Sequence, residues 1–170
     1  MTDFEGLLKS LADGGVNFIL IDGVAATVHG GARLTEDVDV VYQRSEENIK
    51  RLAKAVIRLN PYLRGAPAGL PFQWDKETIE RGLNFTLSTN LGSLDLLGKI
   101  IDGGCYDDLL PHTFELELFS IRCRCLNLQQ LIHVKRAAGR PKDLEAIAEL
   151  EALQDETDSL HDRERTRNYD

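Results

Sequence analysis

Several signals that would assign a class at once are missing from this sequence of 170 residues. It contains no run of about 18 apolar residues, so we expect no transmembrane helix and no membrane association. Its first ten residues, MTDFEGLLKS, are acidic and amphipathic, whereas a secretory signal peptide is basic and then apolar. We therefore expect a cytoplasmic protein.

Cysteine is also scarce. Cys105, Cys123 and Cys125 are odd in number, and the last two are only two positions apart. This pattern favours reduced thiols over a disulfide framework or a zinc site. The sequence has no HExxH, P-loop or GxGxxG motif, which excludes these routes to a metal or a nucleotide.

Positive charge is the minority: 20 Lys and Arg stand against 28 Asp and Glu, for a net charge of −8. Such a balance argues against a broad, non-specific nucleic-acid surface. A hydrophobic content of 42% and a charged content of 28% are typical of a globular protein. We expect one domain over residues 1–153, followed by a polar, disordered tail over 154–170.

Hydrophobic periodicity predicts a mixture of strands and helices. Strands are expected at 16–21, 37–42, 84–88, 93–97, 113–119 and 121–126. Helices are expected from residue 4 to Gly14, over 24–29, from Ser45 to before Pro61, and over 128–153 with a break at 139–141. This order predicts an α/β (α+β) fold, with a mixed sheet flanked by helices and a C-terminal helical cap.

The stretch from Phe18 to Tyr42 carries the strongest chemical signal. In it, Asp37 and Asp39 flank Val38 on an expected strand, so both carboxylates leave through the same face. Like charges on one face of a strand repel each other. A divalent cation such as Mg²⁺, which takes carboxylate oxygens as ligands, would remove that cost.

Asp95 lies between Leu94 and Leu96 on a later expected strand. If that strand neighbours the first, its carboxylate joins Asp37 and Asp39, and the three can hold one or two Mg²⁺ ions. Asp95 is also suited to accept the proton of an attacking hydroxyl. The alternative is that Asp95 faces water on a half-exposed strand.

Upstream, Asp22 and Gly23 form an expected turn into a short helix, where backbone N–H groups can hold a phosphate. Lys135 falls on the apolar stripe of its helix, so it either extends to the surface or points into a cleft, toward a triphosphate or an acidic partner. Asp143 lies in the first turn of the last helix, where the helix dipole alone favours Asp. Arg33 is a candidate phosphate ligand, with a solvated surface position as the alternative.

These residues resemble a known signature. Gly23, the run from Arg33 to Asp39 and the later Leu94–Leu96 resemble the nucleotidyltransferase signature of the DNA polymerase β superfamily. Residues 131–144 resemble the closing helix pair of its small bacterial members, the group of AbiEii-type toxins and minimal nucleotidyltransferases.

The resemblance implies a nucleotidyltransferase-like domain over 1–153 that uses Mg²⁺ and a nucleoside triphosphate. It implies transfer of a nucleoside monophosphate to a hydroxyl of an RNA end, a partner protein or a small molecule. The implied catalytic and metal-binding residues are Asp37, Asp39 and Asp95. The implied nucleotide-binding residues are Gly23, Arg33, Thr35, Lys135 and Asp143.

The sequence departs from the signature at Asp22, where the family has glycine, and at Glu36, where it has an apolar residue. A carboxylate at position 22 would repel a phosphate unless it turns away or binds metal. Asp22 and the acidic tail therefore support a second hypothesis: a catalytically weak homologue that acts as a protein-interaction module, such as an antitoxin. A homodimer or a toxin–antitoxin partner fits either hypothesis.

Overall fold

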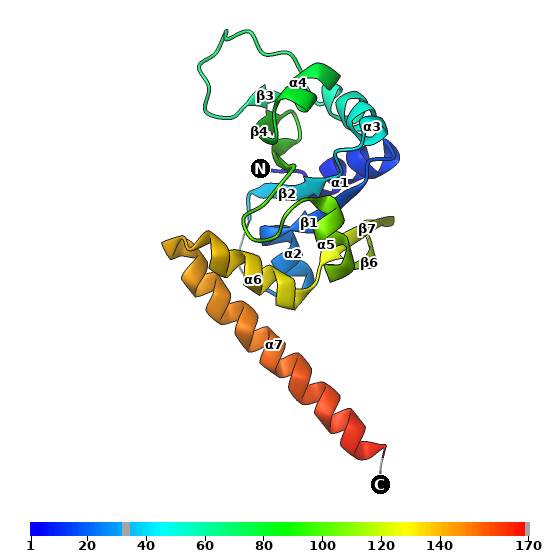
Figure 1. Ribbon diagram of the computed structural model, residues 1–170, viewed down its shortest axis with the longest axis vertical. Coiled ribbons are helices and arrows are strands. Elements are labelled where there is room, and N and C mark those ends of the chain that lie inside the picture. The colour runs from blue at the N-terminus through cyan, green and yellow to red at the C-terminus, as the bar shows by residue number, and fades with distance from the viewer. Residues whose placement is uncertain (32–34, 169–170) are drawn as a thin grey trace.

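The computed structural model describes residues 1–31 and 35–168, and within them seven strands form one mixed sheet. The strands lie in the order β3-β4-β5-β2-β1-β7-β6 (Figure 1). Their bounds are β1 Phe18–Ile21, β2 Asp37–Tyr42, β3 Tyr62–Leu63, β4 Asn84–Thr89, β5 Gly92–Leu97, β6 Thr113–Leu118 and β7 Ile121–Leu126. The α/β fold with a mixed sheet is thus confirmed.

The central strands are buried because both faces of the sheet are covered. All four residues of β1 are buried, as are Val38 to Tyr42 in β2. β1 pairs with β2 in antiparallel fashion and with β7 in parallel fashion. β2 pairs with β5 in parallel fashion, and the β4–β5 hairpin extends the sheet beyond it. This arrangement makes the two carboxylate-bearing strands direct neighbours.

The helices form two groups. Their bounds are α1 Phe4–Asp13, α2 Asp22–Val28, α3 Glu46–Ile57, α4 Lys76–Arg81, α5 Tyr106–Leu109, α6 Leu128–Ala138 and α7 Pro141–Arg167. A short 3-10 helix, Leu110–His112, follows α5. α1 contacts α3 and α3 contacts α4, whereas α2 contacts α6 and α6 contacts α7. The two groups lie on opposite sides of β1 and β2 (Figure 1).

Local sequence accounts for the helix starts. The side chain of Asp3 accepts a hydrogen bond from the Gly6 N–H at the start of α1, and that of Ser45 accepts one from the Asn48 N–H at the start of α3. α6 starts at an Asn127 cap and ends at Gly139, which has the left-handed conformation that glycine adopts without strain. The break expected there separates α6 from α7.

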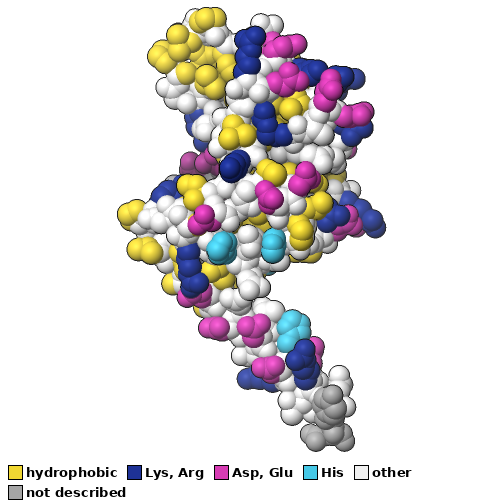
Figure 2. All heavy atoms as spheres, in the orientation of Figure 1, with side chains coloured by type: hydrophobic (Ala, Val, Ile, Leu, Met, Phe, Trp, Pro, Cys, Tyr) yellow, Lys and Arg dark blue, Asp and Glu magenta, His cyan; other side chains and the backbone are white. Residues whose placement is uncertain are grey.

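The last helix is longer than expected. α7 continues to Arg167, whereas we expected a disordered tail from residue 154. No glycine or proline follows Pro141 within it, and alanine, leucine, glutamate and arginine favour a helix even when exposed. Ile147 and Leu150 anchor its first half in the core. Its second half projects from the body and shows mostly charged side chains (Figures 1 and 2).

Within the described residues, no helix combines the length and the apolar character needed to cross a membrane.

Candidate active site

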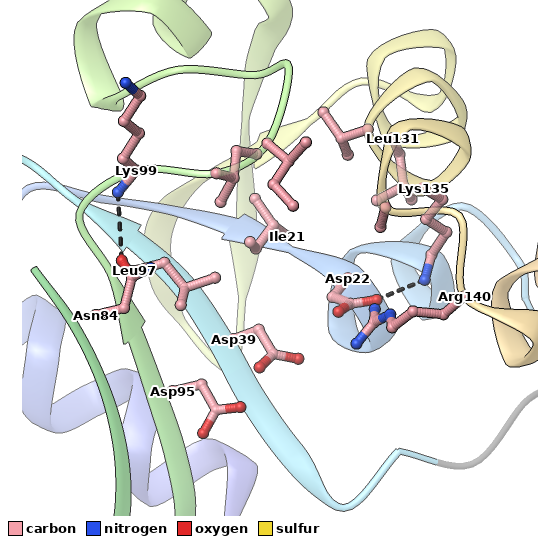
Figure 3. A pocket seen from close by; sticks show the side chains of 14 residues that line it. Ile21, Asp22, Asp39, Asn84, Asp95, Leu97, Lys99, Leu131, Lys135 and Arg140 are labelled. Atoms are coloured by element: carbon pink, nitrogen blue, oxygen red, sulfur yellow. Dashed lines mark hydrogen bonds and ion pairs between the residues drawn. The ribbon is translucent and has the colours of Figure 1, made fainter.

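The candidate site begins with carboxylates on two adjacent strands. Asp39 of β2 lies directly opposite Asp95 of β5, so their side chains leave the same face of the sheet. Asp37 is two residues before Asp39 on that face, opposite Ser93. Asp39 and Asp95 lie side by side in Figure 3. The structure therefore brings together the three carboxylates that the sequence analysis singled out.

Asp39 is the most perturbed of the three. Asp39 as a whole residue is only 9% exposed to solvent. Burial, reinforced by a hydrogen bond with Asp95 and by the negative charge of Asp22, raises the pKa of Asp39 to about 8. No ion pair from a described residue reaches it. A cation beside Asp39 would favour its ionised form.

These side chains are of the right chemical type for a divalent cation, since three carboxylates on one face supply the oxygen ligands that Mg²⁺ takes. The side chains do not converge on one point in this structure. Among the described residues, no group of three or more Asp, Glu, His or Cys side chains is arranged to hold a metal ion. A neighbouring arginine contacts two of the three carboxylates.

Arg64 follows β3 and reaches across β4 to the carboxylates. Its Nη1 lies 3.4 Å from Oδ1 of Asp37, and its Nη2 pairs with Asp95. The backbone N–H of Arg64 donates to the carbonyl oxygen of Thr86 at 3.0 Å. Arg64 was not among the predicted site residues, because it lies in an irregular stretch with no local motif.

On the other side of Asp39, Asp22 forms an ion pair with Lys135. Their Oδ1 and Nζ atoms are 2.5 Å apart (Figure 3). Lys135 is buried and also lies 3.8 Å from Oδ1 of Asp143. Lys135 therefore points into the cleft, toward acidic partners, and does not extend to the surface. The Lys135 ammonium offsets the charge that made Asp22 a concern for phosphate binding.

Asp143 is itself buried and has a second cationic partner. Its Oδ2 accepts a hydrogen bond from Nε of Arg140 at 2.7 Å. This bond raises the pKa of Arg140. Asp143 thus links the start of α7 to Lys135 of α6, a structural role beyond the helix dipole.

Gly23 and Thr35 are in contact. A Cβ atom at Gly23 would lie 2.5 Å from Oγ1 of Thr35, so any side chain there would displace Thr35. The Thr35 hydroxyl donates to the carbonyl oxygen of Asp37 at 3.1 Å. The glycine therefore lets the segment before β2 pack against α2. Arg33, the remaining predicted residue, lies outside the described residues.

Two adjoining cavities share a wall made of Asp22, Asp39, Lys135 and Arg140. The larger, of about 300 Å³, extends to Asp95 and to apolar side chains of the sheet, of residues 100–101 and of α6. The smaller, of about 220 Å³, extends to Gly23, Thr35, Asp37 and Asp143. Every predicted site residue that the structure describes lines one of these cavities.

Solved structures of other proteins share this arrangement of elements. A protein assigned as a nucleotidyltransferase from Thermotoga maritima (TM1012) has a TM-score of 0.53 at 16% identity, covering 87% of this chain and 93% of that one. The antibiotic-resistance factor ANT(2'')-Ia has a TM-score of 0.55 at 13% identity, covering 96% and 94%. Lincomycin-bound LnuA, a lincosamide antibiotic adenylyltransferase, has a TM-score of 0.58 at 12% identity, covering 89% and 98%.

No protein-family model and no curated protein matches the sequence. At 12–16% identity, likeness to these structures speaks for the fold alone. The chain has the nucleotidyltransferase-like fold.

Proposed function

We propose that the chain is a magnesium-dependent nucleotidyltransferase, which moves a nucleoside monophosphate from a nucleoside triphosphate to a hydroxyl acceptor. The observation that carries this proposal is the shared face of Asp37, Asp39 and Asp95 beside the cavities that Lys135 and Arg140 line. The fold is that of proteins described as nucleotidyltransferases and adenylyltransferases, which supports the same reaction class.

In this proposal Asp37, Asp39 and Asp95 would hold one or two Mg²⁺ ions, which offset the charge of the triphosphate and orient it. The need for cations follows from the smaller cavity. Among the described residues that line it, five are acidic and two, Lys135 and Arg140, are basic. A triphosphate alone would be repelled there, because it adds further negative charge to an acidic site.

Each protein group has a part in the transfer. An acceptor hydroxyl oxygen forms a bond to the α-phosphorus, while the bond from that phosphorus to the oxygen bridging to the β-phosphorus breaks. Pyrophosphate leaves with the electron pair of the broken bond. Asp95 accepts the hydroxyl proton and passes it to water. Lys135 and Arg140 stabilise the charge of the departing pyrophosphate, and the Gly23 turn and Thr35 border its phosphates.

Among the acceptor classes considered, a small molecule is favoured over an RNA end or a partner protein. The net charge of −8 disfavours the phosphate backbone of RNA. The larger cavity, with its partly apolar wall, has the size of a small-molecule site. LnuA is described as an antibiotic adenylyltransferase, which makes a similar class of acceptor reasonable for this chain.

The second candidate function is a protein-interaction module, including the antitoxin of a toxin–antitoxin pair. The observation that favours it is the exposed half of α7, which projects from the body and carries acidic side chains at 155, 156, 158, 162 and 164. An acidic helix of this kind can bind a basic partner surface.

Calorimetry with Mg²⁺ and each of the four nucleoside triphosphates tests the first proposal. We expect binding to the wild type and none to Asp37→Ala/Asp39→Ala, which removes two of the cation ligands. Glu156→Ala/Asp158→Ala is the matched control, since it removes two exposed carboxylates elsewhere, and we expect it to bind as the wild type does. Failure of the folded wild type to bind any nucleotide would contradict the enzyme proposal and favour the interaction module.

A further inference from the structure

The guanidinium of Arg64 bridges two strands at the candidate cation site. It contacts Asp37 of β2 through Nη1 and Asp95 of β5 through Nη2. Both carboxylates are among the three to which the proposed function gives a divalent cation. Arg64 therefore occupies oxygen atoms that the cation would need.

The position of Arg64 is built into the fold. Its backbone N–H donates to Thr86, and its Nη2 also donates to the carbonyl oxygen of Leu87 at 3.1 Å. Both acceptors belong to β4, which lies between β3 and β5 in the sheet. The side chain thus crosses β4 along a fixed path before it reaches the carboxylates.

The fit of this side chain is incomplete. The Nε atom of Arg64 is buried and has no hydrogen-bond partner among the described residues. An unpaired buried donor costs free energy, and the charge-assisted contacts with the two carboxylates offset that cost. The following Gly65 and Gly69 have positive φ, and no atom lies within 4 Å of where a Cβ would stand at either position. The chain beyond Arg64 therefore packs little against the body.

Arg64 leaves one carboxylate unmatched. Asp39 is buried and forms no ion pair with a described residue. The guanidinium brings one positive charge to two carboxylates, Asp37 and Asp95, and makes no ion pair with Asp39. A divalent cation can serve all three carboxylates, provided that it displaces the guanidinium.

We propose that Arg64 is an internal counter-cation that competes with the divalent cation for Asp37 and Asp95. It offsets part of the negative charge of the acidic strands in the metal-free protein and raises the cation concentration at which the site fills. This inference rests on the proposed function, because it takes the three carboxylates to be a cation site.

The test is Mn²⁺ binding without nucleotide, measured by electron paramagnetic resonance of the free ion at fixed pH and ionic strength. We expect Arg64→Gln to bind Mn²⁺ about tenfold more tightly than the wild type, because the cation no longer has to displace a guanidinium from Asp37 and Asp95. Arg58→Gln is the matched control, because Arg58 is an exposed arginine at the end of α3. We expect this control to keep the wild-type affinity.

Arg64→Lys is a second variant that keeps the test valid if Arg64→Gln fails to fold. It keeps the positive charge but cannot span both carboxylates with two nitrogen atoms, so its Mn²⁺ affinity should lie between those of the wild type and Arg64→Gln. Equal Mn²⁺ affinities in all these proteins would overturn the inference and leave the proposed function standing. Weaker binding by Arg64→Gln would also overturn it. Absence of Mn²⁺ binding in every protein, with or without nucleotide, would overturn the proposed cation site and the inference together.

Discussion

Position 22 has an aspartate in a backbone conformation that glycine adopts more easily. Its φ is 60°, in the left-handed region, which costs free energy for residues other than glycine but is tolerated best by Asn and Asp. The ion pair with Lys135 stabilises the Asp22 carboxylate in this position. Lys135 in turn lies between two acidic side chains, Asp22 and Asp143.

This arrangement predicts a strong coupling between residues 22 and 135. Lys135→Met should lower the free energy of unfolding by about 1–3 kcal/mol, because it removes the ammonium from buried Asp143, which keeps only Arg140, and from the partly exposed Asp22. Asp22→Asn in the same chain should restore part of that loss. Urea unfolding of the wild type, both single variants and the double variant measures the coupling.

Lys9 provides the matched control. It pairs with Glu5 at 2.6 Å, but its side chain is 43% exposed. Lys9→Met should therefore leave the free energy of unfolding close to the wild-type value. Strictly additive effects of Lys135→Met and Asp22→Asn would show that the pair contributes nothing beyond its separate contacts.

At the scale of elements, α7 combines an anchored half and a free half. Leu150 is 2% exposed and packs in the core, whereas Leu160 is 60% exposed. Leu150→Ala should lower the free energy of unfolding by about 2–4 kcal/mol, because it leaves a cavity. Leu160→Ala should change it by less than about 0.5 kcal/mol. Similar losses from both substitutions in chemical denaturation would mean that the projecting half is packed against something in solution.

The same helix marks a limit of sequence reasoning. The sequence predicted a helix as far as residue 153, which includes the packed half, because hydrophobic periodicity reports burial against a core. Beyond residue 153 no apolar stripe exists, and a polar sequence without glycine or proline is compatible with either a helix or a coil. Composition alone does not distinguish them.

The part of the site that could be predicted from the sequence is the part set by local periodicity. Asp37 and Asp39 share a face because a strand has a period of two, and this follows from the sequence. That Asp95 lies opposite Asp39 depends on which strands are neighbours, which local pattern does not determine. Arg64 was missed for the same reason, since its partners are contributed by other strands and its own segment carries no periodic signal.

At the scale of the whole molecule, the candidate site exists only when the chain is folded. Its residues come from α2, β2, β5, α6 and α7, so they span positions 22 to 143. A ligand that binds this site binds the native state and not the unfolded chain, and it must therefore stabilise the entire fold. Because the lining of the site is acidic, we expect an anionic ligand to bind there only together with cations.

These two properties predict a joint effect of Mg²⁺ and nucleotide on thermal unfolding. At about 100 times the dissociation constant, the preferred nucleoside triphosphate with Mg²⁺ should add about 2.7 kcal/mol to the free energy of unfolding. The same nucleotide in EDTA should add almost nothing, because the carboxylates repel it. Calorimetric scans of the wild type and of Asp37→Ala/Asp39→Ala measure the difference, with Leu160→Ala as a variant that should respond fully. An equal stabilisation in EDTA would mean that Lys135 and Arg140 bind the phosphates unaided, and the three carboxylates would then need another purpose than holding a cation.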